Sequence, residues 1–134
     1  MTGFANLTDT RILVVEDDPD YAEWIELALE VLKVAEIVKA PDGEAALALV
    51  ESQPPFDLIV CDWLMPKMNG LDFLKRYREK VASSLFLVLT AKDGLEDAFE
   101  AIQAGATNYL VKPVTVEKLR DAVASMLRSG ATAA

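Results

Sequence analysis

Short runs of apolar residues, each ending on polar residues, recur along the chain and predict buried strands. Four consecutive hydrophobic residues precede Glu16, and a second run of four ends on Asp62. Runs without alternating polar positions are typical of strands that are buried on both faces of a parallel sheet. The second predicted strand is more polar, which places it at a sheet edge. The predicted strands cover residues 11–15, 34–39, 58–61, 85–89 and 109–111.

Between these runs, hydrophobic residues recur every three or four positions, which is the spacing of an amphipathic helix. Asp18 is the expected N-cap of the first helix and Pro19 its first residue, and this helix is expected to reach about Lys33. Gly105 is placed to end the fourth helix. The five apolar stripes are Tyr21, Ile25, Ala28 and Leu32; Ala45, Ala46, Leu49 and Val50; Leu71, Leu74, Tyr77 and Val81; Leu95, Ala98, Phe99 and Ile102; and Val116, Leu119, Val123 and Met126.

The strands and helices alternate five times, which predicts an α/β fold. The expected architecture is a doubly wound, five-stranded parallel sheet flanked by five helices. With 134 residues, the chain can bury the core of one domain. We expect an N-terminal extension at residues 1–10, a single domain at residues 11–128 and a frayed C-terminal tail at residues 129–134.

Composition narrows the range of functions. The net charge of −9 argues against nucleic acid as a direct partner, because phosphate backbones require clustered Lys and Arg. No apolar run approaches the length of a membrane span, so no membrane partner is expected. The one cysteine, Cys61, cannot form an internal disulfide, which favours the reducing cytoplasm. The chain has no histidine and therefore cannot carry a phosphohistidine of its own.

Polar side chains stand at the carboxyl ends of four predicted strands. Glu16 and Asp17 follow the first strand, Asp62 the third, Thr90 the fourth and Lys112 the fifth. Parallel strands bring these ends to one edge of the sheet. Three neighbouring carboxylates repel one another unless a cation lies among them, and an all-oxygen ligand set favours Mg²⁺. With a hydroxyl and a lysine, the set predicts a site that transfers a phosphoryl group onto Asp62.

Four motifs contain these polar residues: Val14-Val15-Glu16-Asp17, the stretch from Asp62 to Gly70 with its Met-Pro and Asn-Gly, Thr90-Ala91, and Tyr109-Leu110-Val111-Lys112-Pro113. In these motifs the chain resembles a response-regulator receiver domain of the CheY type, as found in two-component signalling systems. The resemblance covers residues 11–128 and implies a flavodoxin-like sheet with the strand order 2-1-3-4-5. It also selects Glu16 and Asp17 from three consecutive acids and leaves Asp18 as the helix cap.

The resemblance implies a role for each site residue. Asp62 would accept a phosphoryl group from a histidine kinase or a histidine phosphotransfer protein. Thr90 and Lys112 would bind the phosphoryl oxygens, and a cis Lys112–Pro113 bond would direct the lysine into the site. The implied Mg²⁺ ligands are Glu16, Asp17, Asp62 and the backbone carbonyl of Leu64.

The resemblance also implies a switch. Tyr109 would rotate on phosphorylation and change the face formed by the fourth helix, the fifth strand and the fifth helix, which would control a downstream protein. The expected state is a monomer or a dimer that forms on phosphorylation. Leu64 and Lys92 occupy positions that flank the path of the hydrolytic water in the family. Because neither side chain is suited to position that water, we hypothesise a long-lived phosphorylated form.

Three alternatives remain open at the level of sequence. A haloacid-dehalogenase-like phosphatase also combines a nucleophilic aspartate with Mg²⁺, but it requires an Asp-x-Asp pair after the first strand and usually a cap insertion. A flavodoxin-like FMN carrier needs a phosphate loop where this chain has three acids, which would repel a phosphate. A receiver that is never phosphorylated could act as an interaction module alone. Reaction with acetyl phosphate, or binding of beryllofluoride, that requires Mg²⁺ separates the phospho-acceptor from these alternatives.

Overall fold

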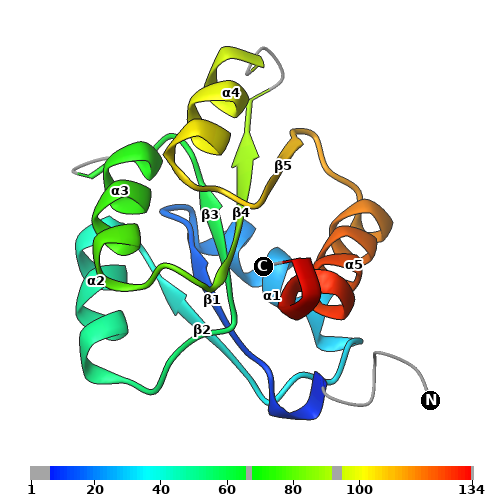
Figure 1. The fold of residues 1–134 in the computed structure, drawn as a ribbon. Coiled ribbons are helices and arrows are strands. Elements are labelled where there is room, and N and C mark those ends of the chain that lie inside the picture. The colour runs from blue at the N-terminus through cyan, green and yellow to red at the C-terminus, as the bar shows by residue number, and fades with distance from the viewer. Residues whose placement is uncertain (1–6, 66–67, 92–94, 134) are drawn as a thin grey trace.

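The computed structural model describes residues 7–65, 68–91 and 95–133, with side chains as far as Ser129. Strands and helices alternate along the chain, as the sequence predicts (Figure 1). Among the described residues, none of the helices combines the length and the apolar character needed to span a membrane. The elements are β1 (Arg11–Val15), α1 (Pro19–Glu30), β2 (Glu36–Ala40), α2 (Gly43–Ser52), β3 (Leu58–Asp62), α3 (Gly70–Lys80), β4 (Leu85–Thr90), α4 (Leu95–Ala104), β5 (Asn108–Val111) and α5 (Val116–Ala133).

The five strands form one parallel sheet in the order β2-β1-β3-β4-β5, which confirms the predicted order. The more polar β2 lies at an edge, as expected from its sequence. In the centre, Val15 pairs with Cys61, so the residues that follow β1 lie beside the end of β3. The chain reverses its direction of winding between β1 and β3, and open α/β sheets bind ligands at such a point.

Helices cover both faces of the sheet (Figure 1). Residues alternate in direction along a strand, so Leu13 belongs to the core on one face and Val14 to the core on the other. The first core cluster joins the sheet to α2, α3 and α4, and the second joins it to α1 and α5. The largest fully buried side chains include Tyr77, Phe73, Phe86, Ile25, Leu29 and Leu87.

Only one residue of the predicted apolar stripe of α4, Ala98, faces the core, and the other three do not. Ala98 and Ala101 are the buried residues of this helix, whereas Leu95, Phe99 and Ile102 are 76%, 66% and 44% exposed. The helix lies on the protein through its small residues, which permit close approach, and turns its large apolar side chains outward. Hydrophobic spacing identified the helix correctly but not the side that faces the core.

The ends of three segments also differ from expectation. Helix α1 stops at Glu30, before the predicted Lys33, and Lys33 has a φ of +58° in the turn that follows. Helix α5 continues to Ala133, through the residues that were expected to fray. In the N-terminal extension, Leu7 is buried and its carbonyl accepts a hydrogen bond from the Thr10 backbone N–H at 3.0 Å. The part of the extension that the structure describes therefore packs against the domain.

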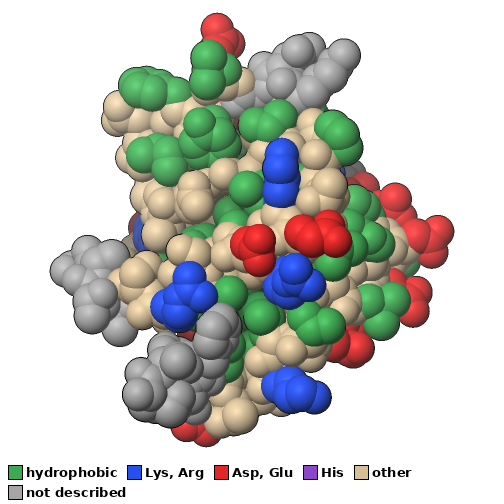
Figure 2. Space-filling view, turned by 90° about the vertical axis from the view of Figure 1, so that its right-hand side faces the viewer, with side chains coloured by type: hydrophobic (Ala, Val, Ile, Leu, Met, Phe, Trp, Pro, Cys, Tyr) green, Lys and Arg blue, Asp and Glu red, His purple; other side chains and the backbone are tan. Residues whose placement is uncertain are grey.

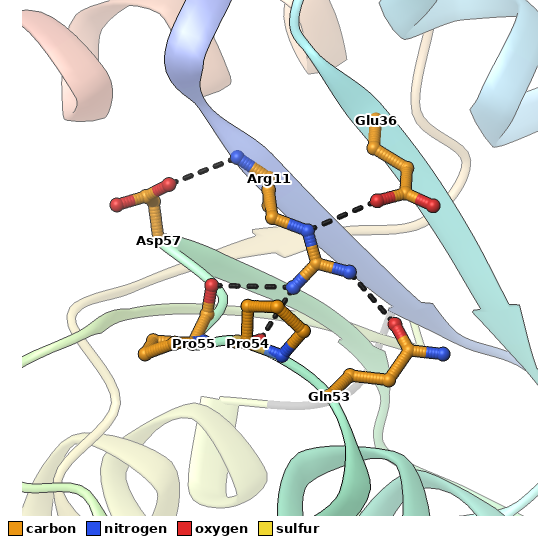
Figure 3. Close-up of polar contacts among 6 residues, drawn as sticks. All are labelled: Arg11, Glu36, Gln53, Pro54, Pro55 and Asp57. Carbon is orange, nitrogen blue, oxygen red and sulfur yellow. Dashed lines mark hydrogen bonds and ion pairs between the residues drawn. The ribbon is translucent and has the colours of Figure 1, made fainter.

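Arg11 connects the amino-terminal ends of β1, β2 and β3, at the end of the sheet opposite the acids (Figure 3). The backbone N–H of Arg11 donates to the Asp57 carboxylate at 2.9 Å, before β3, and the guanidinium pairs with Glu36 of β2 at 3.0 Å. This guanidinium also lies 4.4 Å from the ring centroid of Phe56, within the range of a cation–π contact. The remaining acceptors of the guanidinium are the Gln53 side chain and the carbonyls of Pro54 and Pro55.

Candidate functional site

Three carboxylates meet at the carboxyl ends of β1 and β3. Oxygen atoms of Glu16, Asp17 and Asp62 lie within 4.8 Å of one another. Glu16 and Asp62 are buried, with 4% and 8% of their surface exposed, and Asp17 is exposed. The structure thus brings together the three acids that the sequence placed at different strand ends.

The surroundings of this cluster disfavour the ionised form of two of its carboxyl groups. Burial, together with the negative charge of Asp62, raises the pKa of Glu16 from 4.5 to about 7, against a backbone hydrogen bond from Asp18 that lowers it. Burial likewise raises the pKa of Asp62, although Lys112 acts in the opposite direction. An arrangement of this kind favours either a bound proton or a bound cation.

Lys112 reaches the cluster from β5. Its Nζ donates a hydrogen bond to Asp62 Oδ1 at 3.1 Å, and the Lys112–Pro113 peptide bond is cis. Burial lowers the pKa of Lys112, but the hydrogen bond and the negative charges of Asp62 and Glu16 outweigh that effect and raise it overall. The lysine is therefore a stable cation directly beside the Asp62 carboxylate.

Two buried oxygen atoms at this edge of the sheet have no hydrogen-bond partner among the described residues. They are Oε1 of Glu16 and Oγ1 of Thr90, and Thr90 is only 1% exposed. A buried polar atom without a partner costs free energy, which a ligand at the site can recover. The Glu16 oxygen suits a hard cation, and the Thr90 hydroxyl can donate to an anion. The donor set of buried carboxylate oxygens without Cys or His therefore fits Mg²⁺.

The three consecutive acids have two different roles: Glu16 and Asp17 belong to the acid cluster, and Asp18 caps a helix. Asp18 caps α1, and its side chain accepts from the backbone N–H groups of Asp20 and Tyr21. In turn, the Asp18 backbone N–H donates to Oε2 of Glu16 at 3.1 Å, which orients the Glu16 carboxylate. Asp18 is not part of the acid cluster, so the structure assigns it to the helix end and not to the ligand set.

Two backbone hydrogen bonds of Trp63 hold the segment that follows β3 in place. The Trp63 backbone N–H donates to the Leu89 carbonyl at 3.0 Å, and the Gly70 N–H donates to the Trp63 carbonyl at 2.8 Å. A Cβ on Gly70 would lie 2.8 Å from the Trp63 ring, so glycine is needed where α3 begins. Leu64 follows Trp63 and is 65% exposed, and the role of its backbone carbonyl as a Mg²⁺ ligand stays a prediction.

Two predicted positions remain, Tyr109 and Lys92. Tyr109 is half-buried and packs against the first core cluster. Lys92 lies outside the described residues, as do Pro66 and Lys67, so the hypothesis about phosphoryl lifetime stays a prediction.

Sequence reasoning missed one neighbour of the site. The Lys112 ammonium lies 4.7 Å from the ring centroid of Tyr21, which was assigned only to the apolar stripe of α1. Tyr21 is half-buried and turns one side of its ring toward the lysine. Its place in the first turn of a helix that begins beside the acids was the available signal.

A family model for the response regulator receiver domain matches residues 12–124. The chain is 36% identical over 121 residues to the transcriptional regulatory protein CiaR of Streptococcus pneumoniae, covering 90% of this chain and 53% of that protein. It is 34% identical over 124 residues to the alkaline phosphatase synthesis transcriptional regulatory protein PhoP of Bacillus subtilis, covering 92% of this chain and 51% of PhoP.

Solved structures give the same result. A response regulator receiver domain protein from Clostridium thermocellum superimposes with a TM-score of 0.83 at 27% identity, covering 93% of this chain and 99% of that one. The receiver domain of the Francisella response regulator 1452 gives a TM-score of 0.79 at 30% identity, covering 90% and 98%.

The chain spans about half the length of the curated relatives it matches. Their names describe transcriptional regulators. The relatives therefore do not support the expectation, drawn from net charge, that nucleic acid is not a direct partner. For this chain that expectation stays a prediction.

Proposed function

Because the chain belongs to the response regulator receiver domain family of two-component systems, we propose that it accepts a phosphoryl group on Asp62 from a phosphohistidine of a partner protein. The partner is a histidine kinase or a histidine phosphotransfer protein. The observation that carries the proposal is the placement of Lys112 Nζ 3.1 Å from Asp62 Oδ1, beside two further carboxylates. The buried Thr90 hydroxyl at the end of β4 has no partner within the part of the chain that the structure describes.

The transfer is a displacement at phosphorus. An oxygen of the Asp62 carboxylate forms the new O–P bond while the P–N bond to the partner's imidazole breaks, and the imidazole leaves with the electron pair of that bond. Lys112 and Thr90 bind the phosphoryl oxygens and stabilise the charge on them. The Asp62 carboxylate lies at the carboxyl end of β3, next to the Lys112 ammonium that would stabilise the incoming phosphoryl oxygens.

A divalent cation would occupy the acid cluster. Glu16, Asp17, Asp62 and the backbone carbonyl of Leu64 would hold Mg²⁺, which supplies positive charge to offset the carboxylates and the incoming phosphoryl group. Without a cation, the raised pKa of Glu16 shows that the site resists full ionisation. Asp62 then changes from a carboxylate paired with Lys112 into an acyl phosphate that carries more negative charge.

The α4-β5-α5 face would carry the signal to a downstream protein. Figure 2 shows hydrophobic side chains over the upper part of this side of the molecule, at the height of α4 in Figure 1. Leu95, Phe99 and Ile102 supply the exposed apolar surface of α4, and the acids Glu96 and Glu100 stand among them. A partner segment with apolar residues and flanking basic residues would complement this surface.

Phosphorylation would reach that face through Thr90 and Tyr109. Thr90 ends β4 and would move toward the phosphoryl oxygens, because its hydroxyl has no partner among the described residues. Tyr109 lies on the adjacent strand β5, half-buried against the core, and would follow into the space that Thr90 leaves. The switch works only if phosphorylation favours one of two arrangements of these side chains.

The direct test uses phosphoramidate as the donor and intact-mass spectrometry as the readout. Wild type should gain one phosphoryl group when Mg²⁺ is present, and Asp62→Asn should gain none. Asp18→Asn is the matched control, since asparagine also caps helices and Asp18 lies outside the acid cluster. A phosphorylated Asp62→Asn protein, or a failure of wild type to react, would contradict the proposal.

A further inference from the structure

The Lys112 ammonium lies between two partners, and only one of them belongs to the proposed phosphoryl site. On one side is Asp62 Oδ1 at 3.1 Å, and on the other is the Tyr21 ring, whose centroid is 4.7 Å from Nζ. A cation within about 6 Å of an aromatic centroid is attracted by the electron-rich face of the ring. The ammonium group is therefore held from two directions.

Tyr21 is supported from behind by Trp24. The two rings stack with their centroids 5.2 Å apart and their planes inclined by 20°. Both side chains are half-buried and pack against the second core cluster, which fixes the stack on α1. A continuous row of contacts thus runs from Trp24 through Tyr21 and Lys112 to Asp62.

The environment keeps the Tyr21 ring neutral. Burial raises the pKa of the phenol, as do the charges of Glu16 and Asp62, whereas Lys112 lowers it. A neutral phenol attracts the ammonium through its ring face and does not compete with Asp62 as a second anion. In the structure the ammonium lies over the ring face and donates its hydrogen bond to Asp62.

Lys112 needs such a support because it borders open space. A groove of about 700 Å³ lies between the start of α1 and the segment after β5, and it is lined by Asp18, Asp20, Tyr21, Trp24, Ala91, Lys112, Pro113 and Val114. The lysine side chain is 30% exposed. Its four-carbon stem has many rotamers, and water or the acids Asp18 and Asp20 in the groove would stabilise an ammonium that swung away from Asp62.

We propose that Tyr21 is a positioning residue: its ring, backed by Trp24, holds the Lys112 ammonium at Asp62 and so sets the rate at which Asp62 is phosphorylated. The effect on rate rests on the proposed function of Asp62. The placement of Lys112 by the ring does not depend on that function, and it can be measured in the unphosphorylated protein.

The placement is tested by NMR of protein labelled with ¹³C-lysine. The Tyr21 ring current should shift the Lys112 Hε resonance upfield in wild type and in Tyr21→Phe, which keeps the ring. Tyr21→Leu keeps apolar bulk but should lose the upfield shift. Phe56→Leu is the matched control, because it removes a ring beneath the Arg11 guanidinium at the opposite edge of the sheet and should leave the Lys112 signal unchanged.

The effect on rate is tested with phosphoramidate and Mg²⁺, so that contacts with a protein kinase do not contribute. Tyr21→Leu should be phosphorylated about 3- to 10-fold more slowly, in keeping with the strength of a half-buried cation–π contact. Tyr21→Phe and Phe56→Leu should stay within about twofold of wild type. Trp24→Leu should lose rate in the same direction but by less, and thermal unfolding confirms that each variant is folded.

Two results would overturn the proposal. One is an upfield shift of Lys112 that survives in Tyr21→Leu, because the Tyr21 ring would then not be its source. The other is a Tyr21→Phe protein that reacts as slowly as Tyr21→Leu, because the hydroxyl and not the ring would then be responsible. If wild type is not phosphorylated at all, the proposed function fails, whereas the Lys112 shift still decides whether Tyr21 positions the lysine.

Discussion

Replacing Glu16 with glutamine should stabilise the protein in the absence of Mg²⁺. Glutamine has the shape of glutamate and can still accept the backbone hydrogen bond from Asp18, but it carries no charge. Glu16 is 4% exposed, and the pKa of its carboxyl group rises from 4.5 to about 7 on folding, through burial and the nearby Asp62 charge. The ionised carboxylate therefore works against the folded state.

The sign of the pH dependence follows from this shift. Between pH 4.5 and about 7 the folded protein holds the Glu16 proton more tightly than the unfolded chain, so the free energy of unfolding falls as the pH rises through this range. A rise of the pKa from 4.5 to about 7 corresponds to roughly 3.5 kcal/mol at most, at about 1.4 kcal/mol per pH unit. Because water and Lys112 screen the carboxylate, we expect a gain of about 1–3 kcal/mol for Glu16→Gln at pH 8.

The assay is urea unfolding of both proteins at pH 5 and pH 8, with and without Mg²⁺. The advantage of Glu16→Gln should shrink toward zero at pH 5, where the wild-type carboxyl group is protonated. Added Mg²⁺ should stabilise wild type more than the variant, because the cation binds the folded acid cluster. Glu79→Gln, at an exposed position of α3, is the matched control and should show neither effect. A Glu16→Gln protein that is less stable than wild type at pH 8 without Mg²⁺ would refute the reasoning.

Three further predictions concern other parts of the molecule. Trp63 is buried beside the acid cluster, so its emission should change when Mg²⁺ is titrated into a Trp24→Phe background; an unchanged signal in protein that binds Mg²⁺ would contradict this. Beryllofluoride should alter hydrogen exchange in α4 and β5 as well as around Asp62, and a change confined to the acceptor would argue against the switch. Arg11→Met should lower the free energy of unfolding by about 1 kcal/mol, because the guanidinium's ion pair with Glu36 and its hydrogen bonds to Gln53 and the carbonyls after α2 are lost, and should leave the rate of Asp62 phosphorylation unchanged; equal stability would show that this cluster is dispensable.

The strand pattern was the most informative part of the sequence. Apolar runs such as 58–61 are buried along their full length, because a central parallel strand has helices on both faces. The polar residues that follow these runs lie at one end of the sheet because all five strands are parallel. Parallel strands with right-handed crossovers place all their carboxyl ends together.

Side-chain direction was the least predictable feature. In α4 the spacing of Leu95, Phe99 and Ile102 fits a buried stripe, yet Ala98 and Ala101 face the core. Periodicity shows that apolar residues share a helix face, but the neighbouring elements decide which face is covered. A helix that binds a partner also has an apolar face, and sequence spacing alone does not distinguish a face buried in the core from a face exposed for a partner.

The hydrophobic pattern also does not predict side-chain contacts between elements that are far apart in the sequence. Tyr21 fitted the apolar stripe of α1, and its contact with Lys112 depends on the approach of α1 to the end of β5. That Lys112 and Asp62 lie at the same end of the sheet was expected from topology. Their hydrogen bond of 3.1 Å, and a Thr90 hydroxyl without a partner among the described residues, depend on side-chain packing that the sequence pattern does not contain.

The central claim is that Asp62 is the phosphorylated residue, and borohydride reduction tests it most directly. The wild-type chain is incubated with a phosphohistidine-bearing donor protein and Mg²⁺ and then treated with borohydride, which reduces an aspartyl phosphate to homoserine. Peptide mass spectrometry then locates the homoserine. Our account predicts homoserine at position 62 alone and none when Mg²⁺ is removed. Homoserine at Asp17 or Asp18, or its absence from every aspartate in a reacted chain, would contradict it.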